Sequence, residues 1–134
     1  MPGFSKLSNS NSAEVARILL VDDESHLRHA LCRLLSIPGY EVDSAGDAVS
    51  ALAALRQKTF DLVVTDLQMP DMDGLQLLTA VQKHFPKVPV ILMSGSPGAS
   101  RAQALAAGAV AFLQKPFAFN DLLVLVARAL NEQS

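Results

Sequence analysis

Five residues at four places in the chain carry side chains that could together transfer a phosphoryl group: Asp22, Asp23, Asp66, Ser94 and Lys115. Carboxylates can supply a nucleophile and the oxygen ligands of a hard divalent cation such as Mg²⁺, which usually also keeps water and binds a phosphoryl oxygen. A lysine ammonium group can pair with an anion, and a serine hydroxyl can donate a hydrogen bond to it. This set therefore contains the parts needed to phosphorylate a carboxylate by in-line displacement.

Each of these residues comes at or just after the end of an apolar run that is typical of a buried parallel strand. The runs cover residues 17–21, 62–65, 90–93 and 109–113, and a shorter strand is predicted over residues 40–45. Amphipathic helices are predicted between and after them, over about residues 27–35, 48–55, 75–85, 101–107 and 120–130. This alternation predicts a doubly wound α/β domain whose parallel strands all end at one edge, where ligands bind.

Three carboxylates at one edge would repel one another and raise at least one pKa unless a cation holds them. Mg²⁺, or Mn²⁺ in its place, is therefore the expected cofactor. Two structural alternatives stay open at this point. Asp66 could be an ordinary loop or cap residue, and Asp22 or Asp23 could cap the helix that follows.

Size and composition narrow the classes of protein that the chain could be. Its 134 residues fit one domain, predicted over residues 15–134, after a serine- and asparagine-rich tail (residues 1–14) that we expect to be disordered. A net charge of -2 provides no basic field, so we expect no direct nucleic-acid binding and no membrane association. The single cysteine, Cys32, and the absence of a long apolar run agree with a soluble cytoplasmic protein.

Taken in order, these motifs resemble the receiver (REC) domain of bacterial two-component response regulators over about residues 17–130. The matching features are the acidic pair Asp22-Asp23, the D-x-x-M-P-x-M-D-G motif of residues 66–74, the small hydroxyl residue Ser94, and Lys115-Pro116-Phe117. Each feature is weak alone, whereas the set at successive strand ends is specific. The resemblance implies a flavodoxin-like (βα)5 fold with a five-stranded parallel sheet in the order 2-1-3-4-5.

The resemblance also implies a role for each matching residue. Asp66 would accept a phosphoryl group from the phosphohistidine of a histidine kinase. Asp23 and Asp66 would bind Mg²⁺ directly, Asp22 would help through water, and the backbone carbonyl of Gln68 would complete the site. Ser94 and Lys115 would contact phosphoryl oxygens, and Phe112 would turn when Ser94 moves inward. Phe112 could equally be a plain core residue. A cis Lys115-Pro116 peptide is also expected.

In this reading the chain is a signalling domain that catalyses only its own phosphorylation and dephosphorylation. Its expected partners are a sensor histidine kinase or phosphotransfer protein, and an output domain or downstream protein that binds the fourth helix, fifth strand and fifth helix. The sequence leaves a homodimer open. The alternative is a receiver fold that works as a protein-interaction scaffold without phosphorylation. A haloacid dehalogenase-type phosphatase is disfavoured because Gln68 stands where that class has a second acid, and dinucleotide binding because no G-x-G-x-x-G follows the first strand.

Overall fold

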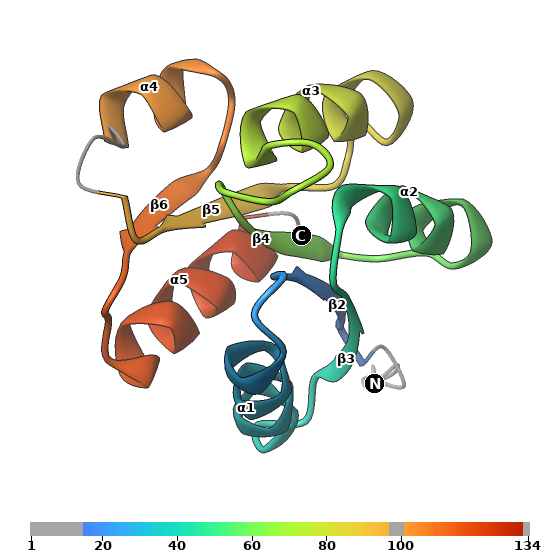
Figure 1. Ribbon diagram of the computed structural model, residues 1–134. Coiled ribbons are helices and arrows are strands. Elements are labelled where there is room, and N and C mark those ends of the chain that lie inside the picture. Colours follow the sequence, from blue (N-terminus) through green and yellow to red (C-terminus); the bar gives the residue numbers. More distant parts are fainter. Residues whose placement is uncertain (1–14, 97–100, 133–134) are drawn as a thin grey trace.

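The computed structural model describes residues 15–96 and 101–132, in which five strands alternate with five helices (Figure 1). The strands are β2 (Arg17–Val21), β3 (Glu41–Ala45), β4 (Leu62–Asp66), β5 (Val90–Ser94) and β6 (Ala111–Gln114). The helices are α1 (Ser25–Ser36), α2 (Ala48–Gln57), α3 (Gly74–His84), α4 (Arg101–Ala106) and α5 (Phe119–Asn131). The predicted tail, residues 1–14, and residues 97–100 of the loop after Ser94 lie outside the described residues.

All five strands run parallel, and their order across the sheet is β3-β2-β4-β5-β6. This is the order 2-1-3-4-5 when the strands are counted along the chain, so the predicted doubly wound α/β fold is confirmed. β4 is the central strand and is paired with a neighbour on each side. Its five residues are all buried, because helices cover both faces of the sheet.

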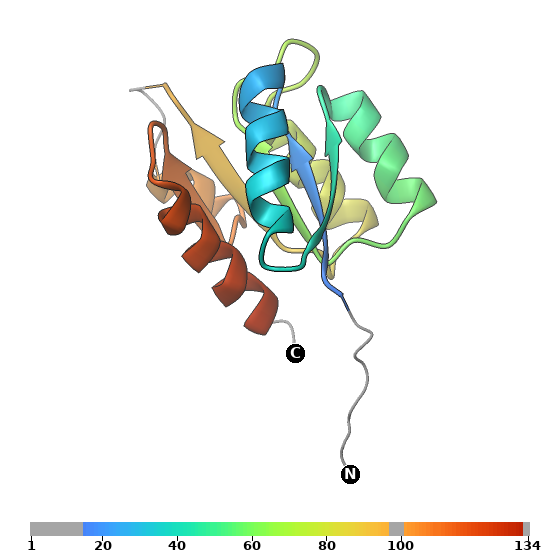
Figure 2. The same ribbon diagram turned by 90° about the horizontal axis from the view of Figure 1, so that it is seen from below.

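Two apolar cores fill the space between the sheet and its helices. Helices α1 and α5 cover one face, while α2, α3 and α4 cover the other (Figures 1 and 2). Alternate strand residues point to opposite faces, so Val63 joins the core under α2 and α3 whereas Leu62 and Val64 join the core under α1 and α5.

The predicted elements differ from the observed ones mainly at their ends. Asp66 is the last residue of β4, rather than the first residue after it, and Ser94 likewise ends β5. In α1 the predicted apolar face is only partly covered, since Leu31 and Leu35 are buried but Ala30 is exposed. The reason is that the space between α1 and the start of α5 is a groove rather than a packed core.

The helices return the chain to the amino edge of the sheet, so β2 begins and α5 ends on the side away from the carboxyl ends of the strands (Figure 2). The Lys115-Pro116 peptide bond is cis, as predicted. Within the described residues, no helix combines the length and apolar character needed to cross a membrane.

Candidate functional site

Three aspartates meet at the carboxyl edge of the sheet. Asp22 follows β2 and Asp66 ends β4, and both are buried, at 0% and 6% exposure, whereas Asp23 is exposed. Carboxylate oxygens of the three residues all lie within 4.8 Å of one another. Such a cluster of hard oxygen ligands fits a divalent cation such as Mg²⁺, with Asp23 open to solvent on its outer side.

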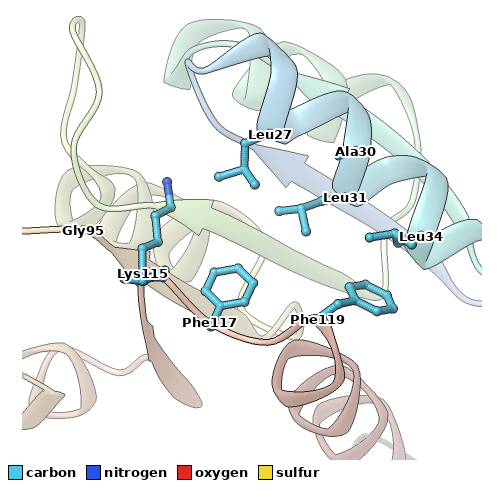
Figure 3. Close-up of a pocket in the computed structure, with 9 residues that line it drawn as sticks. Leu27, Ala30, Leu31, Leu34, Gly95, Lys115, Phe117 and Phe119 are labelled. Atoms are coloured by element: carbon cyan, nitrogen blue, oxygen red, sulfur yellow. The ribbon is translucent and has the colours of Figure 1, made fainter.

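The ammonium group of Lys115 reaches this cluster from the end of β6. Its Nζ lies 3.0 Å from Oδ2 of Asp22 and 3.1 Å from Oδ2 of Asp66, so one cation is shared by two buried anions. Lys115 follows β6, which is two strands away from β4, and its side chain extends away from the end of β6 (Figure 3). The sequence prediction that Lys115 and the acids meet at one edge is confirmed by these distances.

Burial and charge act against each other on these groups. Burial raises the pKa of Asp66 above its ordinary value, although the hydrogen bond and charge of Lys115 act to lower it. Burial alone would lower the pKa of Lys115, but its hydrogen bonds and charge interactions with Asp22 and Asp66 raise that pKa on balance. Lys115 therefore stays charged at neutral pH, while Asp66 is held in a site that disfavours its negative charge.

Neither Asp22 nor Asp23 is the N-cap residue of α1, although the Asp22 side chain does accept a backbone N–H at the start of the helix. The N-cap residue is Glu24, and its side chain makes no capping hydrogen bond. Asp22 instead accepts a hydrogen bond from the Glu24 backbone N–H through Oδ1, at 2.9 Å. The guanidinium of Arg28 in α1 donates to the Asp22 carbonyl at 2.7 Å. The first contact orients the Asp22 carboxylate, the second holds its backbone, and the other carboxylate oxygen accepts from Lys115.

Ser94 lies beside the cluster at the end of β5, with its side chain buried. Its hydroxyl donates a hydrogen bond to Oε1 of Gln68 at 3.1 Å and accepts one from the Ser96 backbone N–H at 3.1 Å. Gln68 also donates its own backbone N–H to Oδ1 of Asp66, at 3.4 Å. The sequence singled out Gln68 for its backbone carbonyl, but no local pattern indicated the contact of its side chain with Ser94.

The loop that follows Asp66 is held from the outside by Asp71, a residue that the sequence analysis did not identify. Both Asp71 carboxylate oxygens accept backbone N–H groups at the start of α2, from Ala48 at 3.2 Å and Val49 at 3.1 Å. The N–H of Val49, more than that of Ala48, holds the pKa of Asp71 below its ordinary value. The only signal in the sequence was an acid in a turn-rich segment, which has many explanations.

Gly74, the last residue of the motif, allows this loop to close on β4. Its backbone N–H donates to the carbonyl of Leu67 at 2.7 Å. A Cβ at this position would lie 2.6 Å from the backbone oxygen of Asp66 and 2.8 Å from the Cα of Leu67. Because both neighbours are backbone atoms, a side chain here would displace the strand end that carries Asp66.

Phe112 lies in β6, and its side chain is 3% exposed in the core under α2, α3 and α4. The neighbouring strand places Leu92 beside it in the sheet. Its burial agrees with a core role, and the predicted turning of its ring remains a prediction.

An apolar groove of about 550 Å³ adjoins the cluster between α1 and the start of α5. Figure 3 shows the rings of Phe117 and Phe119 facing Leu27, Leu31 and Leu34 of α1. Gly95 and Lys115 line the same groove, so it opens directly onto the acidic site.

Known proteins are similar to this chain in sequence and in fold. A family profile described as "Response regulator receiver domain" matches residues 18–127. The response regulator protein FleR of Pseudomonas aeruginosa is 42% identical over 114 residues, which are 84% of this chain and 24% of FleR. Among solved structures, a CheY-like receiver domain protein of Methanospirillum hungatei JF-1 is 35% identical with a TM-score of 0.83, over 89% of this chain and 96% of that one.

A second similar solved structure is a complex with a bound ligand. It is the response regulator TrrA of Thermotoga maritima in complex with Mg(2+)-BeF, at 31% identity and a TM-score of 0.79, over 87% of this chain and 100% of that one. The chain spans between about a quarter and about half of the length of the curated relatives FleR, AtoC and MprA, at 24%, 26% and 52%.

Proposed function

The chain belongs to the family of response regulator receiver domains, and from this premise we propose that Asp66 is the residue that accepts the phosphoryl group. The observation that supports this most directly is its environment. Asp66 ends the central strand, lies within reach of Asp22 and Asp23, and is bound by the ammonium of Lys115 at 3.1 Å. The alternative of an unphosphorylated scaffold gives no reason for two buried acids around a shared lysine.

The proposed reaction transfers a phosphoryl group from a phosphohistidine to Asp66. A carboxylate oxygen of Asp66 attacks phosphorus, the O–P bond forms as the N–P bond breaks, and the histidine nitrogen keeps the bonding electron pair. Lys115 pairs with the negative charge on the phosphoryl oxygens. The Ser94 hydroxyl donates a hydrogen bond to another of these oxygens once the group is in place.

We assign the divalent cation, Mg²⁺ or Mn²⁺, to the carboxylates of Asp23 and Asp66, with Asp22 acting through water and the Gln68 carbonyl as a further ligand. The three clustered carboxylates fit such an ion, because they supply hard oxygen ligands and because their negative charge exceeds the single positive charge of Lys115. When bound, the ion neutralises charge on the acceptor and the transferred group.

The groove between α1 and α5 is the proposed docking place of the phosphoryl donor, a sensor histidine kinase or a phosphotransfer protein. The groove is continuous with the site, because Gly95 and Lys115 belong both to the groove and to the edge where Asp66 lies. A donor protein has to bring its phosphohistidine to that edge, and apolar contacts in the groove would hold it there.

The proposed output surface is formed by α4, β6 and α5. Leu105 of α4, Val110 just before β6 and Val124 of α5 leave 42–47% of their area exposed. The curated relatives are about two to four times as long as this chain, so a further domain of the same protein is the occupant we assign to this surface. Phosphorylation would alter the surface through Ser94 and Phe112, which lie on the adjacent strands β5 and β6.

Intact-mass spectrometry after incubation with acetyl phosphate and Mg²⁺ tests the proposed function. We expect one added phosphoryl group in the wild-type protein, and none in Asp66→Asn or in the presence of EDTA. Labelling that persists in Asp66→Asn would assign the acceptor to another residue. If acetyl phosphate adds nothing, beryllofluoride should still stabilise the wild-type protein, and its failure to do so would favour the scaffold alternative.

A further inference from the structure

The hydroxyl of Ser94 is already engaged on both sides in this structure. A serine hydroxyl has one proton to donate, and Ser94 donates it to Oε1 of Gln68 at 3.1 Å. The same oxygen accepts the Ser96 backbone N–H, also at 3.1 Å. Because the Ser94 side chain is fully buried, the hydroxyl also cannot turn to water in place of these partners. It can donate to a phosphoryl oxygen only by leaving Gln68.

Gln68 links this hydroxyl to the acceptor itself. Its backbone N–H donates to Oδ1 of Asp66, while its side chain holds Ser94, so one residue contacts both groups. The loop that carries Gln68 is in turn held to the start of α2 by Asp71. The loop that carries Gln68 is therefore held at Asp66 on one side and at α2 on the other.

We propose that Gln68 is a positioning residue that holds the Ser94 hydroxyl in its resting orientation and must release it when Asp66 is modified. The inference rests on the proposed function, because it concerns the same phosphoryl group. A neutral serine–amide bond is exchanged for a stronger hydrogen bond to a charged oxygen, so the exchange is favourable only when the phosphoryl group is present. Gln68 thereby disfavours the active state by the free energy of one neutral hydrogen bond, which has to be broken before Ser94 can turn.

The resting contact can be tested in the free protein. Loss of the donor in Ser94→Ala should shift the side-chain carbonyl carbon signal of Gln68 in NMR spectra. The corresponding signal of Gln57, an exposed glutamine at the end of α2, should not move. A Gln68 signal that is unchanged by Ser94→Ala would overturn the proposal, and this readout needs neither metal nor phosphoryl donor.

The functional consequence can be measured as beryllofluoride affinity in the presence of Mg²⁺. Gln68→Met keeps the length of the side chain without the acceptor, and should tighten binding by about two- to tenfold, the value of one neutral hydrogen bond. Gln68→Met should have no effect in a Ser94→Ala background, where there is no hydroxyl to release. The matched control Gln57→Met should bind like the wild-type protein.

The outcomes separate this inference from the proposed function. Wild-type protein that binds beryllofluoride, with Gln68→Met unchanged or weaker, would overturn the role of Gln68 alone. An equal effect of Gln68→Met with and without the Ser94 hydroxyl would do the same, because the effect would not pass through Ser94. Wild-type protein that neither binds beryllofluoride nor labels with acetyl phosphate would overturn both proposals together.

Discussion

The Nζ atom of Lys115 lies 3.1 Å from Oδ2 of Asp66, and the same nitrogen lies 3.0 Å from Oδ2 of Asp22. One positive charge thus serves two buried carboxylates, with a third, Asp23, within 4.8 Å. The cluster keeps an excess of negative charge, which a divalent cation can offset. Most of the expected behaviour of this domain follows from that imbalance.

Removal of the Lys115 charge should destabilise the fold. Lys115→Met should cost about 2–3 kcal/mol at neutral pH, because two buried carboxylates lose their partner. The folded-state pKa of Lys115 is raised above the ordinary value of 10.5. The stabilisation of the folded state by its charge is therefore fully present below pH 10.5 and is lost as pH rises through the folded-state pKa. Urea unfolding across this range measures the difference. Lys58→Met is the control, since its ion pair with Asp43 is exposed and worth about 0.2–1 kcal/mol; equal losses would contradict the prediction.

In EDTA, Asp66→Asn should raise the melting temperature at neutral pH. Burial raises the folded-state pKa of Asp66 above the ordinary value of 3.8, so ionisation of Asp66 destabilises the folded protein. Stability is therefore lost as pH rises through the folded-state pKa. The gain from asparagine should therefore shrink as the pH falls toward about 4. Each kcal/mol should appear as about 4 °C in thermal unfolding. A lower melting temperature in Asp66→Asn would show that the carboxylate stabilises the resting protein.

Mg²⁺ should stabilise the wild-type protein more than Asp23→Ala. A ligand at about 100 times its Kd stabilises a fold by about 2.7 kcal/mol. Loss of Asp23, an exposed carboxylate that we propose as a ligand, should weaken this effect with little direct damage to the core. Thermal unfolding with and without Mg²⁺ measures both shifts. Glu132→Gln removes an exposed acid just beyond α5 and should keep the full shift. Identical shifts in all three proteins would place the ion elsewhere.

Gly74→Ala should destabilise the protein by about 1–3 kcal/mol. The new Cβ would lie 2.6 Å from the Asp66 carbonyl oxygen, and a backbone atom cannot move aside as a side chain can. Denaturant unfolding measures the loss, and labelling by acetyl phosphate should fall with it because Asp66 is displaced. The control is Gly95→Ala, whose Cβ would meet Lys115 at an ordinary 3.7 Å. Equal stability of the two variants would contradict the prediction, because it would show that the end of β4 can move away from the new Cβ at little cost in free energy.

Asp71→Asn should lower the melting temperature at neutral pH, since the carboxylate that accepts the Ala48 and Val49 N–H groups loses its charge. The N–H of Val49 in particular lowers the pKa of Asp71, so this stabilisation is present above the ordinary value of 3.8 and is lost as pH falls through the folded-state pKa. The difference from wild type should therefore vanish in acid. A pH-independent difference would point to altered loop packing instead.

The parts of the site that the sequence predicted are those that local patterns determine. Buried apolar runs predicted the positions of the strands. Because the carboxyl ends of parallel strands lie at one edge of the sheet, the residues at these ends could be placed together: Asp22, Asp66, Ser94 and Lys115. The family resemblance gave Asp22 and Asp23 different roles, but the local pattern did not show which of the two side chains is buried. Which of two adjacent acids turns inward depends on the register at the strand end, and only the structure shows Asp22 buried against Lys115.

The contacts that were missed join segments that are distant along the chain. Gln68 and Ser94 are 26 residues apart, and Asp71 and Ala48 are 23 apart, so neither pair leaves a local pattern. The predicted inward face of α1 shows the same limit. Helical spacing predicted which side of α1 faces the core. Ala30 on that side nevertheless remains exposed, because the start of α5 does not pack against it.

The return of the chain to the amino edge of the sheet has a practical consequence for reporters of phosphorylation. β2 begins and α5 ends on that edge, and a five-residue strand separates it from Asp66 by about 16 Å. A fluorescent protein attached beyond Glu132 would therefore approach from the side remote from the proposed acceptor. It would leave Asp66 open to phosphoryl donors while staying joined to α5, which is part of the proposed output surface.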